Sequence, residues 1–336
     1  MLAFARTRWF RPDRTEHDAE ALAGLLWSKG IARLCNTHGP ADYPFAPTES
    51  WQGDAFFGRH FANASGTVWV RLSTRSRLQE RCDLDSFVAA ALPSIREPFC
   101  LLTTDGDTAV PSQLRSETAT ALLESPFLRA WYTQNHDGFT HPKLRPFPIG
   151  LDLHTPRPEG DAAALAGLLR DLRELRVPLA EARPRVFCDL RLALSSPDRH
   201  DAVDALRGNR HAAMPWRRLS QGALWRRYAA SPFVLSAVGN GIDCHRTYEA
   251  LYLGCIVITK RSSIAPLFEG LPVAFVESWA EAGDPANLRR WTAELGPLTA
   301  RDNVDRRLDP RRWIAALEAE LPRPTAGYLT PRTDAP

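Results

Sequence analysis

The chain has 336 residues, a length that globular proteins usually divide into about two domains. Apolar residues make up 44% and charged residues 24%, and a formal net charge of +3 is too small to indicate a nucleic-acid-binding protein. No run of about 18 apolar residues is present, and the first 20 residues lack the apolar core and cleavage site of a signal peptide. We therefore expect a globular protein without a transmembrane segment, and a peripheral membrane contact stays open.

Arginine supplies nearly all of the positive charge, since only three of the 42 basic residues are lysine. Coding bias explains this excess more simply than binding of phosphate or acidic sugars. The six cysteines are scattered without a Cys-x-x-Cys pair, and several stand in apolar runs, where a reduced cysteine acts as a small hydrophobe. A zinc site or a disulfide framework is therefore not expected, and a reducing cytoplasmic location is.

An alternation of strands and helices begins at Gly66. Short apolar runs predict strands, and apolar residues at helical spacing predict helices. The expected strands are 68–72, 99–103, 128–133 and 144–149, and the expected helices are 17–34, 84–92 and 118–123. Prolines cluster just after these elements, and a polar stretch runs from 153 to 161. We place a boundary between two lobes there.

The alternation continues in the second half of the chain. The expected strands are 185–190, 233–236, 255–258 and 273–276, and the expected helices are 162–175, 198–207, 220–229, 279–295 and 310–320. The tail over 322–336 is rich in Pro and Thr and is predicted to be disordered. The chain therefore divides into an N-terminal lobe of residues 1–152, a C-terminal lobe of residues 153–321 and the tail.

One stretch, SPFVLSAVGNGIDCHRTYEALYLGCIVI at 231–258, joins a strand to a helix and then to a second parallel strand. Gly239 and Gly241 permit a tight turn with outward-facing N–H groups, and Asp243 is a favourable N-cap for the helix. A glycine turn that opens a helix after a strand is a natural seat for a phosphate. The turn therefore predicts a phosphate-binding site.

The helix after this turn has one predicted buried arc, made of Cys244, Tyr248, Leu251 and Tyr252. Arg246 and Glu249 lie off that arc, where they would face a cleft. The guanidinium of Arg246 can bind a diphosphate, and the carboxylate of Glu249 can accept hydrogen bonds from sugar hydroxyls. These residues predict a nucleotide-sugar pocket, although an ion pair on a solvated helix face is the structural alternative.

Neighbouring side chains extend the expected donor site. A positive imidazole is disfavoured at a helix start, so a neutral His245 would bond a phosphate or a sugar hydroxyl. Lys260 ends the next strand and would meet phosphate. The predicted donor-binding residues are Gly239, Asn240, Gly241, Asp243, His245, Arg246, Glu249 and Lys260. Each has a structural alternative as a turn, cap or surface residue.

The first lobe offers candidate groups at the carboxyl end of a strand, in the sequence TTDGD at 103–107. Asp105 and Asp107 are either turn residues around a glycine, an acceptor site or general base, or a metal-binding Asp-x-Asp pair. Asn135 and His136 are candidates for the acceptor side of the cleft. The groups able to take the acceptor proton are His60, Asp105, Asp107, His136 and Asp137, and their order stays open.

A Trp-Arg-Arg triplet occurs twice, at 216–218 and 225–227. Alternating basic and aromatic residues are found in proteins that bind single-stranded nucleic acid. Such triplets more often belong to helices whose aromatic residues face inward and whose arginines are solvated. The small net charge agrees with this interpretation. We therefore expect no nucleic-acid partner.

The stretch 239–279 resembles the carboxyl-terminal region of exostosin-like glycosyltransferases of the bacterial and viral type. The residues that match the family pattern best are Arg246, Glu249, Ala250, Leu251, Gly254, Cys255 and Ile256. The resemblance extends more weakly to PFCLLTTDGD (98–107), LRAWYTQN (128–135) and KLRPFPIGLD (143–152). Val257 departs from the pattern, which has proline at this position.

The resemblance implies an α/β protein of the GT-B type, with two Rossmann-like lobes facing a central cleft. It places the nucleotide-sugar donor on the C-terminal lobe and a carbohydrate or other hydroxyl acceptor on the N-terminal lobe. It further implies inversion without an obligatory metal or cofactor, in the synthesis of surface polysaccharides or other glycans. Arg246 would stabilise the leaving diphosphate. Asp105 and Asp107 are the candidate catalytic carboxylates of the first lobe, and the choice of base among the five groups above stays open. A non-catalytic glycan- or nucleotide-binding protein with the same fold is the alternative.

Overall fold

The computed structural model describes residues 22, 24–47, 50–72, 81–179, 181–190, 192 and 197–322. The tail predicted to be disordered lies outside these residues from position 323 onward, as does the start of the helix expected over 17–34. The described part of that expected helix contains the 3₁₀ helix η1 (Gly30–Leu34), preceded by an isolated bridge between Trp27 and Gly150.

The first sheet is parallel, and its strands follow one another in chain order. They are β1 (Gly66–Arg71), β2 (Phe99–Thr104), β3 (Leu128–Thr133) and β4 (Leu144–Pro146). The helices of this half are α2 (Asp54–His60), α3 (Asp83–Ala90) and α4 (Ser116–Glu124), with η2 (Tyr43–Phe45) and η3 (Leu92–Ser94). All residues of β2 are buried, which is the pattern of a parallel strand covered on both faces.

The second sheet is also parallel, with strand order β6-β5-β7-β8-β9. Its strands are β5 (Val186–Phe187), β6 (Ala212–Ala213), β7 (Phe233–Leu235), β8 (Ile256–Lys260) and β9 (Val273–Val276). Successive residues of β7 face opposite sides: Phe233 and Leu235 join one core cluster, and Val234 joins another. Two layers of helices therefore cover this sheet.

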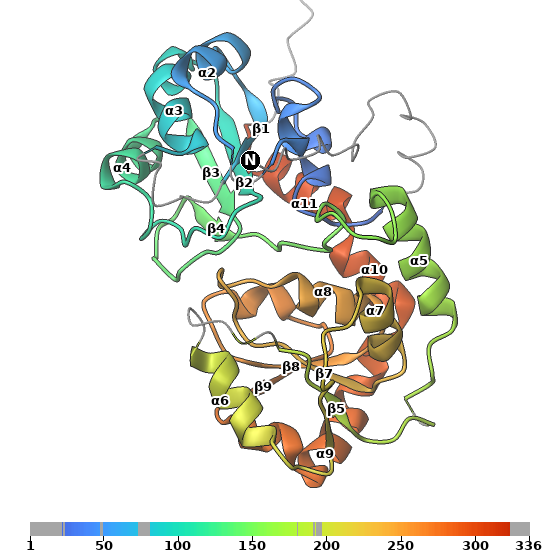
Figure 1. The fold of residues 1–336 in the computed structure, drawn as a ribbon. Helices are drawn as coiled ribbons and strands as arrows, with labels where there is room; N and C mark the ends of the chain where they lie inside the picture. Colours follow the sequence, from blue (N-terminus) through green and yellow to red (C-terminus); the bar gives the residue numbers. More distant parts are fainter. Residues whose placement is uncertain are drawn as a thin grey trace, which may run out of the picture.

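One layer contains α5 (Ala162–Glu174), α7 (Gln221–Ala229), α8 (His245–Tyr252) and α10 (Arg301–Leu308). The other contains α6 (Pro197–Leu206), η5 (Trp279–Gly283) and α9 (Pro285–Leu295). The short helices η4 (Ala265–Phe268) and η6 (Gly296–Thr299) complete this half. Figure 1 shows α8 on the side of the second sheet that faces the first lobe. These two parallel α/β sheets confirm the predicted pair of Rossmann-like lobes.

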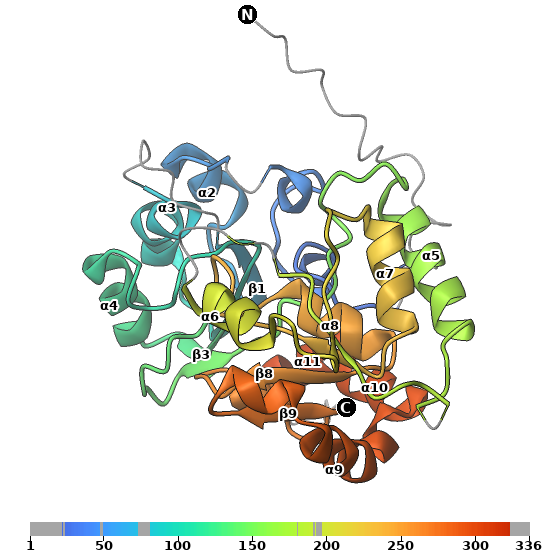
Figure 2. The same cartoon turned by 60° about the horizontal axis from the view of Figure 1, so that its bottom comes forward.

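The last helix, α11 (Pro310–Ala319), crosses back to the first lobe, as Figures 1 and 2 show. Ile314 and Leu317 belong to the core cluster of the first sheet, and the ring of Trp313 lies 5.4 Å from that of Phe147. In the opposite direction, Trp27 belongs to a core cluster of the second sheet. Segments from both ends of the chain therefore tie the two lobes together.

The strand order places a topological switch in the second lobe. Counted within the lobe, the order is 2-1-3-4-5, which reverses direction between β5 and β7. In open α/β sheets the ligand crevice lies at the carboxyl ends of the strands on either side of such a reversal. The described strands of the first sheet run in order without one. The topology therefore predicts a ligand crevice at the carboxyl ends of β5 and β7.

Some predictions of local structure are wrong. The expected helix 279–295 is interrupted at Asp284, whose side chain accepts the N–H of Ala286, while Pro285 opens α9 in the first helical turn. The helices α2 and α10 and the two-residue strand β6 were not predicted. Trp225 is buried, as expected for an inward-facing aromatic, but Trp216 is 89% exposed. None of the helices in the described ranges has the length and apolar character that spanning a bilayer requires.

Candidate functional site

The lobes meet where two predicted segments touch. The side-chain oxygen of Asn135, just after β3, accepts the N–H of Asp243 at 2.9 Å, and its amide donates to the carbonyl of Gly106 at 2.8 Å. A Cβ added to Gly241 would lie 2.7 Å from the same Asn135 oxygen. The glycine is therefore required for a close approach of the lobes. A second contact joins the Ser263 hydroxyl to the carbonyl of His136 at 2.6 Å.

The prediction that Asp243 is the N-cap of α8 is wrong. The helix begins at His245, and its N-cap is Cys244, which provides no side-chain cap. The Asp243 carboxylate instead accepts the N–H of Ile149 and the hydroxyl of Tyr248, both at 2.8 Å. Burial raises the pKa of Asp243 to about 6. The other carboxylate oxygen of Asp243 accepts the N–H of Cys244 at 2.9 Å, so the carboxylate joins Ile149 to α8 through Tyr248 and the N-cap residue.

Arg246 lies at the topological switch. Its Nε is 3.1 Å from a carboxylate oxygen of Asp189, just beyond β5, and Tyr228 donates to the same oxygen at 3.0 Å. The Arg246 side chain is 12% exposed. Burial works against its charge, but the Asp189 carboxylate, together with Tyr228 and Cys244, outweighs burial and holds the pKa of Arg246 above its usual range. The structure thus places a guanidinium that stays protonated, paired with the Asp189 carboxylate, at this edge of the sheet.

Glu249 is 4% exposed, so it does not lie on a solvated helix face, the structural alternative given above, and it is covered where a cleft was expected. The helix α7 packs against α8 on this side, and the amide nitrogen of Gln221 lies 3.4 and 3.5 Å from the two carboxylate oxygens. Burial, with the neighbouring charge of Asp152, raises the pKa of Glu249 to about 7. The carboxyl is therefore only partly ionised near neutral pH.

A cavity of about 220 Å³ lies at the carboxyl ends of β7 and β8. Residues from the loop before α8, from its first turns and from the end of β8 line it, among them Ser236, Cys244, Thr247 and Lys260. The Lys260 ammonium is 2.8 Å from a carboxylate oxygen of Asp198 and 5.1 Å from the centre of the Trp279 ring. Lys260 and Arg246 therefore have separate acidic partners.

In the glycine turn that borders this cavity, one backbone N–H group is hydrogen-bonded within the turn itself. The N–H of Gly239 donates to the carbonyl of Gly241 at 3.1 Å, so it does not face outward as predicted. Asn240, between the two glycines, is exposed. A Cβ on Gly239 would lie 2.6 Å from a guanidinium nitrogen of Arg199. Both glycines thus permit close packing.

Asp105 and Asp107 have different surroundings. Asp105 is 2% exposed, has a φ of +65°, and lies 3.0 Å from the Lys29 ammonium. Its other carboxylate oxygen is 3.9 Å from Nε2 of His154. Asp107 is partly exposed. The pair thus contains one buried, ion-paired carboxylate and one that reaches solvent. His60, another candidate base, is in α2, and its ring centre lies 4.8 Å from that of Phe56 in a tilted arrangement.

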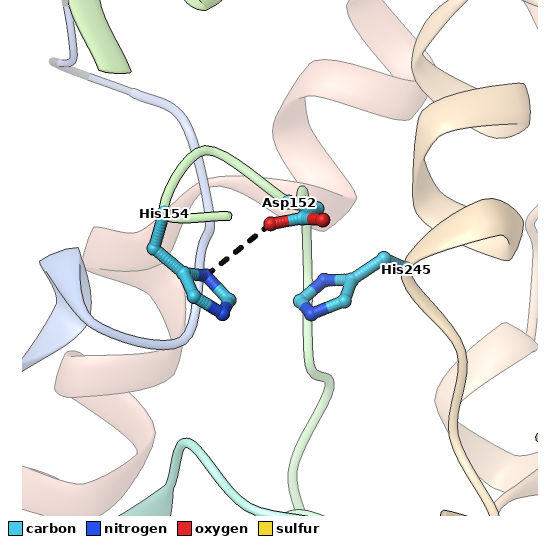
Figure 3. A group of neighbouring side chains, drawn as sticks. All are labelled: Asp152, His154 and His245. Carbon is cyan, nitrogen blue, oxygen red and sulfur yellow. Dashed lines mark ion pairs between the residues drawn. The ribbon is translucent and has the colours of Figure 1, made fainter. Parts of the chain in front are cut away.

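A cluster that the sequence did not reveal lies beside Asp105 and contains Asp152, His154 and His245 (Figure 3). One ligand atom from each residue lies within 4.8 Å of the others, and within the described ranges this is the one group of three or more such residues able to share a metal ion. Asp105 and Asp107 are not part of it. The cluster joins the segment after β4 to the first residue of α8.

The charges within the cluster are unequal. Burial raises the pKa of Asp152, but the neighbouring His245, His154 and Arg157 outweigh burial and hold it below its usual range. Burial lowers the pKa of His154. Asp152 and His154 fall in the stretch that the sequence marked as a lobe boundary. In the sequence, the only sign of this pair is an acidic residue two positions before a histidine, a pattern too common to identify a site.

Comparisons with known proteins give a distant structural similarity. No family model and no curated protein sequence matches the chain. A UDP-forming α,α-trehalose-phosphate synthase from Burkholderia xenovorans is 11% identical, with a TM-score of 0.46, covering 91% of this chain and 86% of its own. A trehalose-6-phosphate protein from E. coli, bound with UDP-2-fluoro glucose, is 11% identical, with a TM-score of 0.44 and coverages of 92% and 86%. At these identities and TM-scores, the similarity does not assign an activity, a substrate or a site residue to this chain.

Proposed function

We propose that this protein is a glycosyltransferase that binds a nucleotide sugar on its second lobe. One observation carries the proposal: Arg246 lies at the reversal between β5 and β7, paired with Asp189. A guanidinium held in place by a carboxylate at the crevice of a parallel sheet suits the departing diphosphate of a nucleotide sugar. The resemblance to exostosin-like enzymes, carried by the residues quoted above, supports the same reaction class.

The donor contacts follow from the elements around this charge. The first turn of α8 has no side-chain cap, and its N–H groups and dipole favour an anion. Lys260 lines the neighbouring cavity. That cavity, at about 220 Å³, is smaller than the roughly 300–1,000 Å³ typical of small-molecule pockets. It would hold part of the donor, and the rest would lie over the crevice between β5 and β7.

The acceptor would bind from the side of the first lobe, at the carboxyl ends of β2 and β3. Asp107 is the base that we favour, because it reaches solvent while Asp105 is buried against Lys29. The proposal includes inversion, a diphosphate neutralised by arginine and backbone dipoles, and a role in the synthesis of surface polysaccharides or other glycans. None of the six cysteines is paired, and we propose a cytoplasmic setting on that basis.

A non-catalytic glycan- or nucleotide-binding protein is the second candidate. The observation that favours it is the close contact of the lobes at Asn135 and Asp243, together with the burial of Glu249. Glu249 would have to be uncovered before it could bind ribose hydroxyls. A binding protein would hold the nucleotide without releasing sugar.

A thermal-shift screen tests the donor site. The full chain is heated with UDP, GDP, CDP and their common sugar conjugates, each with and without EDTA. A ligand that binds only the folded state raises the melting temperature by mass action. We expect one nucleotide family to raise it, with the same increment in EDTA, and we expect the increment to disappear in Arg246→Ala.

Arg227→Ala is the matched control, because this arginine is exposed on α7. It should keep the full increment. An increment that persists in a folded Arg246→Ala variant contradicts the assignment, and so does the absence of any increment with every nucleotide. An increment abolished by EDTA contradicts the metal-independent diphosphate site.

A further inference from the structure

The cluster of Asp152, His154 and His245 brings together ligand types that transition metals prefer. Two imidazoles and one carboxylate converge from separate parts of the chain, and Figure 3 shows the three side chains pointing toward a common space. Imidazole nitrogen and carboxylate oxygen are the ligands of zinc sites with an open fourth position. The cavity beside Lys260 is lined by other residues, so this is a distinct site.

The distances are close to those of a bound ion. Oδ1 of Asp152 and Nδ1 of His154 are 3.5 Å apart. Two ligands of one tetrahedral zinc, each at about 2.1 Å, are separated by about 3.4 Å. All three ligand atoms lie within 4.8 Å of one another, so no separation would have to shorten by more than about 1.4 Å to reach the tetrahedral value.

Hydrogen bonds already orient two of the ligands. Nδ1 of His245 lies 2.8 Å from the carbonyl of Gly150, which can only accept, so the ring donates through Nδ1. Its Nε2 lone pair is then available to a metal, an arrangement usual for metal-bound histidines. Arg157 holds Oδ2 of Asp152 at 2.5 Å, and Oδ1 accepts the N–H of Thr155 at 3.0 Å while it lies toward His154.

His154 supplies an independent sign of a missing partner. Its Nδ1 is buried and has no hydrogen-bond partner among the described residues, since Oδ1 of Asp152 is too distant at 3.5 Å. Buried polar atoms are nearly always satisfied, by protein, by water or by an ion. A metal placed between His154 and Asp152 would satisfy this nitrogen.

The surrounding charges set how tightly an ion would bind. Arg157 pairs with Asp152, and Lys29 pairs with Asp105 on the far side of His154. These charges cancel in pairs, so the site does not attract a cation through excess negative charge. Binding would come from coordination by the two nitrogens, which favours an ion with high affinity for imidazole over magnesium or calcium.

We propose that Asp152, His154 and His245 bind a divalent transition-metal ion that fastens the start of α8 to the segment after β4. Zinc is the probe of choice. The site lies between the lobes, away from the cavity beside Lys260. This inference does not depend on the proposed transfer reaction, because metal binding is measured without any nucleotide.

The test is zinc binding to the full chain, stripped with EDTA and exchanged into metal-free buffer. Equilibrium dialysis with elemental analysis should give one zinc per chain. His154→Ala and His245→Ala should each raise the dissociation constant at least about tenfold, since loss of an outer partner alone costs that much. His60→Ala, altered on the exposed end of α2, should bind as the wild type does.

Two further measurements keep the result decisive. Cobalt substituted for zinc should give a spectrum without thiolate-to-cobalt charge transfer, which excludes the six cysteines as ligands. Circular dichroism in EDTA checks that each variant is folded, and Asp152→Asn replaces any variant that is not. Failure of the wild type to bind zinc overturns the proposal. Wild-type affinity in folded His154→Ala and His245→Ala also overturns it.

Discussion

Glu249 gives the sharpest test of how α8 is buried. Its carboxyl group is almost fully buried, and burial raises its pKa from an ordinary value of 4.5 to about 7. Replacing Glu249 by Gln keeps the shape and removes the ionisation. The variant should therefore behave like the wild type in acid and become more stable than the wild type in base.

The sign follows from proton binding. Between about pH 4.5 and 7 the folded protein keeps a proton that the unfolded chain has lost, so wild-type stability falls as the pH rises through this window. Below this window both states are protonated, and the buried carboxyl costs no stability through ionisation. Above it both states are ionised, and the cost of burying the charge has reached its full, constant value. At about 1.4 kcal/mol for each tenfold change, the full penalty is on the order of 3 kcal/mol.

The assay is urea unfolding in EDTA-containing buffer, followed by tryptophan fluorescence and circular dichroism at about pH 5 and about pH 8.5. Glu249→Gln should exceed the wild type by roughly 3 kcal/mol at the higher pH and by much less at the lower. Glu294→Gln, half-exposed on α9, is the control and should show no such difference. Equal stability differences at both pH values would refute the assigned burial and pKa of Glu249.

Three further substitutions test the packing. Gly241→Ala should destabilise the fold by about 1–3 kcal/mol, because the new methyl meets the buried Asn135 side chain. Gly239→Ala should lower the free energy of unfolding by less than Gly241→Ala does, since its methyl meets the far end of the Arg199 side chain. A larger loss for Gly239→Ala in urea unfolding would contradict this.

Leu317→Ala should lower the free energy of unfolding by about 2–5 kcal/mol, because α11 packs into the core of the first sheet. A calorimetric melt unchanged from that of the wild type would be inconsistent with this packing.

Local sequence signals predicted the elements that are continuous apolar runs between polar residues. The strands at 128–133 and 273–276 have the predicted bounds. The helix α10 was missed because it has only two buried residues, Val304 and Leu308, in a highly charged segment. The strand β6 has two alanines, and its place depends on pairing with β5. Such elements are determined by tertiary contacts that no local window contains.

The site shows the same limit more strongly. The glycine turn drew attention to the segment that meets the first lobe, but its partner Asn135 is more than 100 positions away. Helical periodicity separated Glu249 from the arc facing the sheet, but it could not reveal that α7 covers the remaining face. His154 and His245 are brought together by the path of the chain between the lobes.

The most direct test of the account is release of nucleoside diphosphate from nucleotide sugars, supplied with candidate hydroxyl acceptors and measured with EDTA present. The account predicts acceptor-stimulated release by the wild type with the nucleotide family that the binding screen identifies. In folded Arg246→Ala the rate should fall by roughly 10²–10³-fold, as it does when one electrostatic contact to a developing charge is removed. Release at the wild-type rate by that variant would contradict the central claim that Arg246 stabilises the leaving diphosphate.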